Sequence, residues 1–403
     1  MLGVEERFPA PENFAGASDR LHELAAQQAG SDDFGPPDYR LGLRVLLESM
    51  DYDARFSERG RRIAWGSLLG TLVSRAHAAR AMKDFPEFER AQVKRPVVIS
   101  GLHRTGTTAL HKLLALDPQF QGLQSWITGS PMPRPARAEW EELPAFRQIV
   151  KSLEARFAAA PGLRAAHDMA AEEVDECGGI LCQSFVSMIW SCAWSAASYD
   201  AWWQSQSERA SYEYFRRALK LIGSNDPGRI WLLKHPPHIA NLDLLFAMFP
   251  DARLIQTHRD PAKAIPSLCS LVLANHDLME TGRKAQRARQ LGYRLTGWAA
   301  KALRLAEPVR EAHRGQVLDV RHADFHRDPL ATVRRIYAFL DLALSPEIEA
   351  AMASRVASAP AQNSHRYAAN DFGLAEDEIR EQFEGYIDRY GFRPKALGGG
   401  AGD

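Results

Sequence analysis

The sequence is poor in the features that mark disulfide-linked, membrane-spanning or nucleic-acid-binding proteins. It holds four cysteines in 403 residues and no C-x-x-C pair, which excludes a disulfide scaffold and fits small core positions. No run reaches the ~18 uninterrupted apolar residues of a membrane helix, and the N-terminus lacks a signal-peptide pattern. Fifty basic residues balance fifty acidic ones, so no overall field favours nucleic acid or an anionic membrane. We expect a cytoplasmic protein without integral membrane association or nucleic-acid binding; its oligomeric state is not indicated.

Composition and periodicity predict an α/β region preceded by helices. With 45% hydrophobic and 25% charged residues, the chain is long enough for one large domain or two smaller ones. Apolar residues at helical spacing predict a helical N-terminal region over residues 1–93. Residues 94–394 are predicted to form the α/β domain, with a helical insertion at about 130–222. The glycine-rich end, residues 395–403, is predicted to be a flexible tail.

From Gly228 onward, short apolar segments alternate with helical patterns. The predicted strands cover 230–233, 253–257 and 317–320, and the predicted helices cover 239–249, 262–273, 284–312 and 329–340. Consecutive βα units of this length imply a parallel sheet with right-handed crossovers. We therefore predict a P-loop-like fold of three layers around a central parallel sheet, with functional groups at the carboxyl ends of its strands.

The stretch KRPVVISGLHRTGTTALHKLL, residues 94–114, predicts a buried strand, a turn with glycines at Gly101 and Gly106, and an amphipathic helix. Such a turn directs backbone N–H groups and the positive end of the helix dipole at one point, where an anion is stabilised. The alternative is a turn whose glycines only relieve backbone strain. We interpret the segment as an anion cradle.

The cradle differs from a nucleotide P-loop at one position. Its glycines have the GxxxxGK[ST] spacing, but Thr107 stands where that motif needs lysine. The cation lies inside the loop instead, at Arg104, whose guanidinium can hold two oxygens of one anion. Thr107 and Thr108 add hydroxyl donors at the start of the helix. A standard ATPase is therefore not expected.

Two further loops follow predicted strands. In the sequence HRDP, Arg259 lies at a strand end and Ser267 in the next helix, so both can converge on one phosphate. The alternative is an arginine paired with Asp260 as a helix cap. In the sequence KHPPH, Lys234 can stabilise charge growing on a leaving oxygen, and His238 can accept a proton near neutral pH. The histidines could also be ordinary loop residues, and a zinc site is poorly supported because a third ligand is not evident.

The HRTGTT sequence resembles the phosphosulfate-binding loop of sulfotransferases that use 3′-phosphoadenosine 5′-phosphosulfate (PAPS). It is most similar to bacterial enzymes whose loop reads G-x-P-R-T-G-T-T, although His103 stands where proline is usual. The KHPPH loop resembles the K-x-P-x-H segment of these enzymes, and HRDP with Ser267 resembles their 3′-phosphate site. The three segments occur in the family's order, and the resemblance covers most of the chain.

The resemblance implies a sulfotransferase that uses PAPS and requires no metal. His238 would be the general base, and Lys234 and Arg104 would stabilise negative charge during transfer. His235 is a rival base, as are Glu173 and Glu176 in an acidic cluster that resembles an E-E-x-x-E-C segment; the cluster could also be a helix N-terminus. The residues implied to hold the donor are Arg104, Thr105, Gly106, Thr107, Thr108, Arg259 and Ser267.

The acceptor is expected to be a small, apolar molecule with a hydroxyl or amine. This expectation rests on the aromatic segment 185–203, which could line an apolar pocket and equally could be a buried core helix. A nucleotide-dependent kinase is the second hypothesis, opposed by the missing P-loop lysine. A nucleotide-binding protein without catalytic activity is the third.

Overall fold

A five-stranded parallel sheet lies at the centre of the structure, a computed structural model in which residues 9–159, 170–358 and 368–393 are described. The strand order is β2-β5-β1-β6-β7, and every pair of neighbours runs parallel. The strands are β1 (Val97–Gly101), β2 (Phe120–Gln121), β5 (Ile230–Lys234), β6 (Arg253–His258) and β7 (Val317–Arg321). The predicted α/β fold with a central parallel sheet is confirmed.

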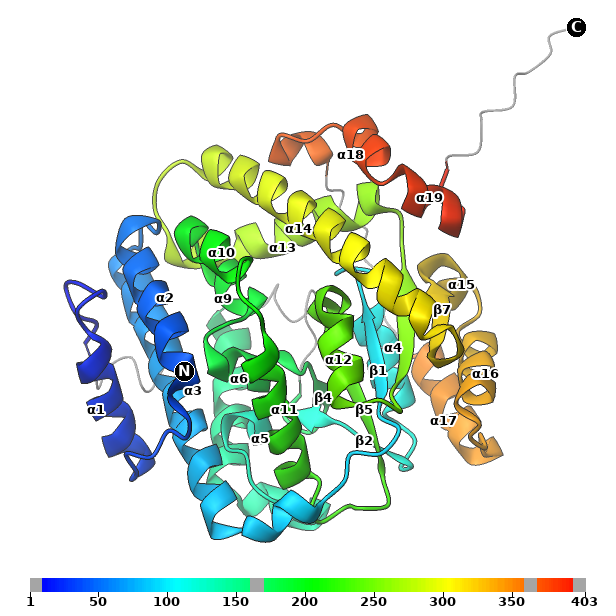
Figure 1. Ribbon diagram of the computed structural model, residues 1–403, viewed down its shortest axis with the longest axis horizontal. Coiled ribbons are helices and arrows are strands. Elements are labelled where there is room, and N and C mark those ends of the chain that lie inside the picture. The colour runs from blue at the N-terminus through cyan, green and yellow to red at the C-terminus, as the bar shows by residue number, and fades with distance from the viewer. Residues whose placement is uncertain (1–8, 160–169, 359–367, 394–403) are drawn as a thin grey trace, which may run out of the picture.

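Helices cover both faces of this sheet (Figure 1). One face carries α4 (Thr107–Leu114), α15 (His322–Arg327), α16 (Pro329–Leu340) and α17 (Pro346–Ala357). The other carries α12 (Leu242–Met248), α13 (Pro261–Met279) and α14 (Lys284–Ala312). This arrangement is the predicted set of three layers.

The central strand shows why the chain folds this way. All five residues of β1 are buried because helices cover both of its sides. Val97 and Ile99 belong to the same core cluster as Leu110 of α4 and Ile336 of α16. Val98 points to the opposite face, into a larger core cluster that includes α12, α13 and α14. The uninterrupted apolar run of β1 thus fixes its place in the middle of the sheet.

Most predicted elements of the sheet region are present, and some of them have different limits. The predicted helices 284–312 and 329–340 coincide with α14 and α16. The predicted helix 239–249 is instead a 3-10 helix, η5 (Pro236–Asn241), followed by α12. Pro236 and Pro237 open η5, where their missing N–H groups cost least. The two-residue edge strand β2 was not predicted.

The described part of the N-terminal region consists mainly of α1 (Ser18–Ala29), α2 (Arg40–Tyr52) and α3 (Glu58–Asp84). Their buried side chains join the larger core cluster of the sheet. Arg75 of α3 is almost fully buried, and its guanidinium donates to the carbonyl oxygens of Phe34 at 2.8 Å and Gln183 at 3.2 Å. This buried cation, held by carbonyls and by an ion pair with Asp38, connects the region to Gln183.

The region predicted to be an insertion, at about 130–222, follows α5 (Ser125–Gly129). Its helices include α6 (Pro144–Ala159), α8 (Gly178–Leu181), α9 (Met188–Ala193), α10 (Ala197–Trp203) and α11 (Arg209–Ile222). A short antiparallel pair joins β3 (Leu123–Gln124) to β4 (Val174–Asp175). The aromatic segment forms two helices, and its rings at Phe185, Trp190 and Trp194 are buried in the core. These rings therefore carry packing.

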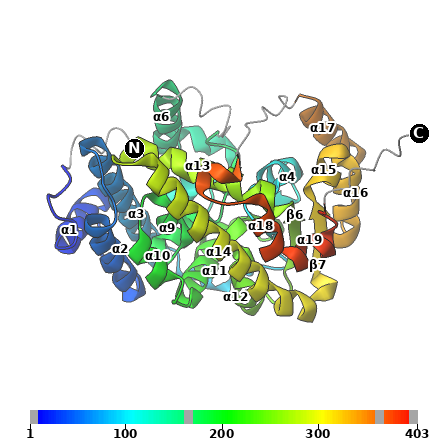
Figure 2. The same cartoon turned by 90° about the horizontal axis from the view of Figure 1, so that it is seen from above.

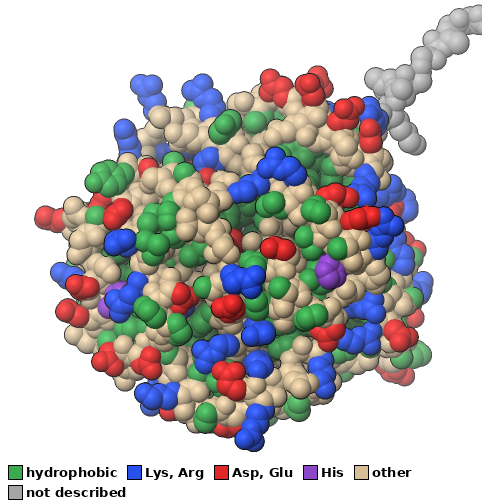
Figure 3. Space-filling view, in the orientation of Figure 1, with side chains coloured by type: hydrophobic (Ala, Val, Ile, Leu, Met, Phe, Trp, Pro, Cys, Tyr) green, Lys and Arg blue, Asp and Glu red, His purple; other side chains and the backbone are tan. Residues whose placement is uncertain are grey.

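The ends of the fold are separated by the sheet. Seen from above, α1 to α3 lie at one end and α15 to α17 at the other (Figure 2). The chain closes with α18 (Glu376–Gln382) and α19 (Glu384–Tyr390), beside α13, α14 and β7. Within the described ranges, no helix has the length and apolar character needed to cross a membrane. The face in Figure 3 carries basic and acidic side chains intermixed. The predicted tail 395–403 lies outside the described residues.

Candidate active site

The loops of interest meet at the carboxyl ends of β5, β1 and β6. Strand β1 lies between β5 and β6, so the strands that follow β1 in the chain lie on both sides of it in the sheet. In parallel sheets this arrangement opens a crevice at the carboxyl ends of the strands. Hydrogen bonds fix the loops to β1: the His235 N–H donates to the Ile99 carbonyl at 3.2 Å, and the Ser100 hydroxyl donates to the Pro236 carbonyl at 3.0 Å. The loops that carry the three predicted segments therefore share one rim.

The cradle has the geometry expected of an anion site. Gly101 has φ of 143°, and a Cβ there would lie 2.4 Å from the Thr257 carbonyl oxygen, so β1 can approach β6 only with glycine. Gly106 has φ of 91° and precedes α4 directly, and Arg104 has φ of 65°. These left-handed residues turn the chain so that the first N–H groups of α4 face the crevice, as anion binding at a helix N-terminus requires.

The three cradle threonines serve different purposes. Thr105 is buried, and its hydroxyl bonds the Leu102 carbonyl and the Thr257 hydroxyl, each at 2.6 Å. Its side chain therefore stabilises the loop, and only its backbone is left to bind a ligand. Thr107 is also buried, whereas Thr108 is half-buried and its hydroxyl accepts from the Lys234 ammonium at 3.3 Å. Thr108 thus lies beside Lys234.

Lys234 and Glu176 form the central ion pair of the site. The Lys234 side chain is only 3% exposed, and its Nζ lies 2.6 Å from Glu176 Oε1. The other carboxylate oxygen, Oε2, lies 3.2 Å from His235 Nδ1. Burial acts to raise the pKa of Glu176, but the Lys234 ammonium and the His235 contacts outweigh it and hold that pKa well below its usual value. Glu176 is therefore an ionised carboxylate with a third of its side chain exposed.

The two acidic candidates for the base, Glu173 and Glu176, have different partners in the structure. Glu173 pairs with Lys112 of α4 at 2.6 Å and with Arg355 of α17 at 3.0 Å, so it links two helices. Glu176 is brought to Lys234 because the backbone N–H of Cys177 donates to the Lys234 carbonyl at 2.9 Å. Only Glu176 of this pair contacts Lys234 and His235.

His238 lies behind this ion pair. The residue is fully buried, and its Nδ1 lies 2.6 Å from the Tyr212 hydroxyl. Its ring contacts the rings of Phe215 and His235, and its Nε2 has no hydrogen-bond partner among the described residues. Burial holds the pKa of His238 well below its usual value, so the ring is neutral. In this conformation an acceptor would have to displace packed side chains to reach it.

The predicted 3′-phosphate residues lie together at the other end of the cradle. The Arg104 Nε donates to the Ser267 hydroxyl at 3.1 Å, and the Arg259 Nη1 donates to the Arg104 carbonyl at 2.8 Å. The side chain of Arg104 thus contacts Ser267. Asp260 caps α13 through the Ala262 N–H at 2.9 Å and pairs with Arg380.

Sequence reasoning missed several neighbours of these groups. Tyr212 holds His238 from α11, where nothing in the helical pattern marks it. His322 and His326 of α15 lie against the cradle, within 3.3 and 3.8 Å of where a Cβ on Gly106 would be. A surface cavity of about 760 Å³ is lined by residues such as Lys94, Arg216 and Asp251, at the amino ends of the strands. It is therefore remote from the site.

A glycine turn after the central strand, with cations at the ends of the neighbouring strands, defines an α/β enzyme site that holds and transfers an anionic group. The sequence pattern of the sulfotransferase family matches residues 96–346, and the chain belongs to that family. It is 36% identical to sulfotransferase STF1 from Mycobacterium tuberculosis, with a TM-score of 0.83 over 93% of this chain and 100% of that one. It is 26% identical to sulfotransferase STF9 from Mycobacterium avium, with a TM-score of 0.82 over 92% and 96% of the two chains. A search of curated proteins gave no match.

The chain is therefore a sulfotransferase, as predicted, and the kinase hypothesis is set aside. Family membership implies the use of a sulfonate donor and a small-molecule acceptor. Neither molecule is identified by these comparisons.

Proposed function

We propose that the protein transfers a sulfonate group from PAPS to a hydroxyl or amine of a small molecule. The observation that carries this proposal is the two-ended site: Arg104, Arg259 and Ser267 lie at one end of the cradle, and Lys234 and Glu176 lie at the other. A donor with one phosphate at each end of its ribose would meet cations or helix N–H groups at both ends. A donor without the 3′-phosphate would leave the first group of residues unused.

In the proposed reaction, a bond forms between the acceptor oxygen or nitrogen and sulfur. The bond between sulfur and the bridging phosphate oxygen breaks, and adenosine 3′,5′-bisphosphate leaves with that electron pair. Lys234 would stabilise the charge on the departing oxygen, because it stands beside Thr108 at the start of α4. The acceptor proton passes to a base of the protein.

We propose Glu176 as that base, in place of the expected His238. Glu176 is partly exposed and touches Lys234, whereas every atom of His238 is enclosed. The low pKa of Glu176 makes it a weak base while Lys234 is its partner. If Lys234 turns to the donor's bridging oxygen, Glu176 loses its counter-charge, and its pKa rises toward the range useful for proton transfer.

Arg104 fits the 3′-phosphate end better than the sulfonate, because its guanidinium contacts Ser267. The cradle's backbone N–H groups, with Thr107 and Thr108, would then hold the 5′-phosphosulfate. The aromatic rings of segment 185–203 were the reason to expect an apolar acceptor, but they belong to the core. They therefore do not support an apolar acceptor. The acceptor class proposed is therefore a small hydroxyl or amine compound without further restriction.

Titration with adenosine 3′,5′-bisphosphate and with 5′-AMP tests the donor assignment. We predict that Arg259→Ala weakens binding of the bisphosphate about 10- to 100-fold, as expected for loss of a charge-assisted hydrogen bond, and leaves 5′-AMP affinity nearly unchanged. Lys263→Ala is the control, because Lys263 lies on α13, four residues after Arg259, but is exposed and paired with Glu376. Equal affinity of the wild-type protein for the two nucleotides would contradict the proposal.

A further inference from the structure

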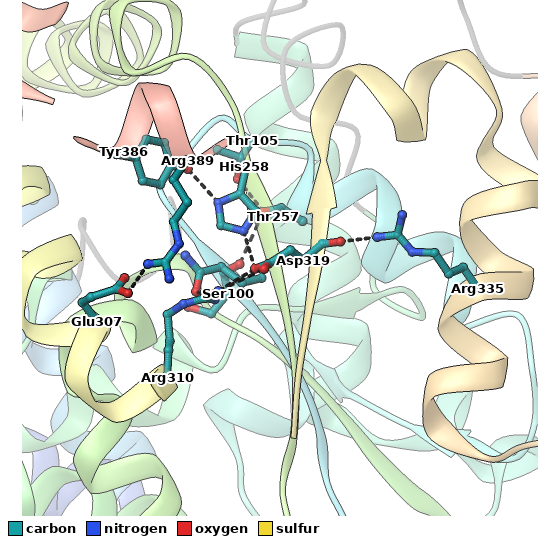
Figure 4. Close-up of polar contacts among 11 residues, drawn as sticks. Ser100, Thr105, Thr257, His258, Glu307, Arg310, Asp319, Arg335, Tyr386 and Arg389 are labelled. Atoms are coloured by element: carbon teal, nitrogen blue, oxygen red, sulfur yellow. Dashed lines mark hydrogen bonds and ion pairs between the residues drawn. The ribbon is translucent and has the colours of Figure 1, made fainter. Parts of the chain in front are cut away.

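A chain of hydrogen bonds passes through the buried imidazole of His258, the residue directly before Arg259. His258, the last residue of β6, is fully buried, and its Nε2 lies 2.8 Å from Asp319 Oδ1 on β7. Arg310 of α14 donates to both oxygens of the same carboxylate, at 2.8 and 3.1 Å (Figure 4). The chain therefore connects the end of β6 to β7 and to α14.

The C-terminal helix α19 completes this chain from the other side of the imidazole. The hydroxyl of Tyr386 lies 2.9 Å from His258 Nδ1, and Figure 4 shows His258 between Tyr386 and Asp319. The ring of Tyr390 stacks on the imidazole with centroids 3.7 Å apart and an interplanar angle of 20°. Helix α19 thus holds His258, the residue directly before Arg259.

The directions of these bonds follow from burial. Burial lowers the pKa of His258, so its ring is neutral and carries one proton. Asp319 can only accept, because its pKa is held below its usual value despite burial by its contacts with His258 and Arg310. The proton must therefore sit on Nε2, and Nδ1 must accept from the Tyr386 hydroxyl. Both imidazole nitrogens of His258 therefore have a hydrogen-bond partner.

Helix α19 is firmly attached to the fold. Arg389 forms an ion pair with Glu307 of α14, and Ile387 is buried in the larger core cluster. The segment lies well beyond residue 346, where the family match ends. The hydrogen bonds from Tyr386 to Asp319 therefore connect a segment outside the matched region to His258, the residue next to Arg259.

We propose that Tyr386 is a positioning residue that holds Arg259 in place, so that helix α19 sets the enzyme's preference for a 3′-phosphorylated nucleotide. This inference rests on the proposed use of PAPS. Two supports direct the guanidinium of Arg259. Its Nη1 binds the Arg104 carbonyl, and the backbone from which it extends follows His258, which Tyr386 and Asp319 hold from both sides. Loss of the second support frees the backbone from which the guanidinium extends, and a guanidinium that samples more orientations binds a phosphate less well.

Two single-atom variants on α19 test this inference. Tyr386→Phe removes the hydroxyl that holds His258 but keeps the aromatic ring. Tyr390→Phe removes a hydroxyl from the same helix and keeps the ring that stacks on His258, so it is the matched control. Affinities for adenosine 3′,5′-bisphosphate and for 5′-AMP are measured by calorimetry on the full-length variants. A general loss of stability would lower both affinities together, whereas loss of positioning changes their ratio.

We expect Tyr386→Phe to lower the affinity for the bisphosphate about 3- to 10-fold, the loss typical of one hydrogen bond, while 5′-AMP binds as before. Tyr390→Phe should keep the wild-type ratio. Asp319→Asn reaches the chain from its other end and should shift the ratio in the same direction, which keeps the inference testable if Tyr386→Phe folds poorly. An unchanged ratio in both Tyr386→Phe and Asp319→Asn would overturn it. If wild-type protein binds both nucleotides equally, this inference falls together with the proposed donor; if only the variants fail to respond, the donor assignment stands.

Discussion

Exchange of Glu176 for glutamine is the sharpest perturbation of the proposed chemistry. The carboxylate lies 2.6 Å from Lys234 Nζ and 3.2 Å from His235 Nδ1, and a third of the side chain is exposed. Glutamine keeps the size of the side chain and an oxygen that can accept one hydrogen bond, but it cannot accept a proton. The exchange therefore removes the base with little change in shape.

The expected loss of the transfer rate is about 10²- to 10⁴-fold, the usual contribution of a positioned general base. At ~1.36 kcal/mol for each factor of ten, the barrier rises by about 3 to 5 kcal/mol. Nucleotide affinity should stay the same or increase, because Lys234 no longer shares its charge with a carboxylate. Single-turnover transfer to an accepted substrate gives the rate, and calorimetry with adenosine 3′,5′-bisphosphate gives the affinity.

The chain offers a matched control in Glu173→Gln. Glu173 belongs to the same acidic cluster but pairs with Lys112 and Arg355, so its exchange should leave the transfer rate within a few-fold of wild type. His238→Asn tests the rival base in parallel. The assignment of Glu176 as the base is refuted if Glu176→Gln keeps more than about a tenth of the wild-type rate while His238→Asn abolishes transfer. The loss in His238→Asn would then exceed the loss expected for Glu176→Gln.

Two other predictions concern stability and its pH dependence. Arg75→Met should lower the free energy of unfolding by about 3–5 kcal/mol in denaturant titrations, because the buried carbonyls of Phe34 and Gln183 lose their charged donor. Arg62→Met is the control, because Arg62 lies on the same helix in an exposed ion pair, and it should change the free energy of unfolding by less than ~0.5 kcal/mol. Similar values for both variants would contradict the role assigned to Arg75. Because the pKa of Glu176 is lower in the fold than in the unfolded chain, its ionised form stabilises the fold above the unfolded pKa, and this stability is lost as the pH falls through the folded value. Melting temperatures of wild type and Glu176→Gln should therefore differ most near neutral pH and converge in acid, and a constant difference would argue against the depressed pKa.

The cradle could be predicted from the sequence because its causes are local. An apolar run makes β1, two glycines at a fixed spacing make the turn, and the amphipathic helix after Gly106 makes α4. The loops that follow β5 and β6 could be placed at the same rim, since the carboxyl ends of parallel strands share one edge. The structure bears out this arrangement of strands and loops.

The finer details of the site depend on long-range packing that no local pattern records. Glu173 and Glu176 differ only in which partner the chain brings to them, and that choice is made by the bond between Cys177 and Lys234. Tyr386 meets His258 across a large separation in sequence, so no periodicity could have linked them. The aromatic segment was ambiguous for a related reason, because the same rings suit a pocket or a core until their neighbours are known.

A crystal structure of the complex with adenosine 3′,5′-bisphosphate is the decisive test of the two-ended site. We expect the 5′-phosphate at the start of α4, in contact with the cradle N–H groups and Lys234. We expect the 3′-phosphate between Arg259 and Ser267, with the Arg259 guanidinium still bound to the Arg104 carbonyl. A nucleotide bound elsewhere, or one whose 3′-phosphate points to solvent away from Arg259, would contradict the two-ended site.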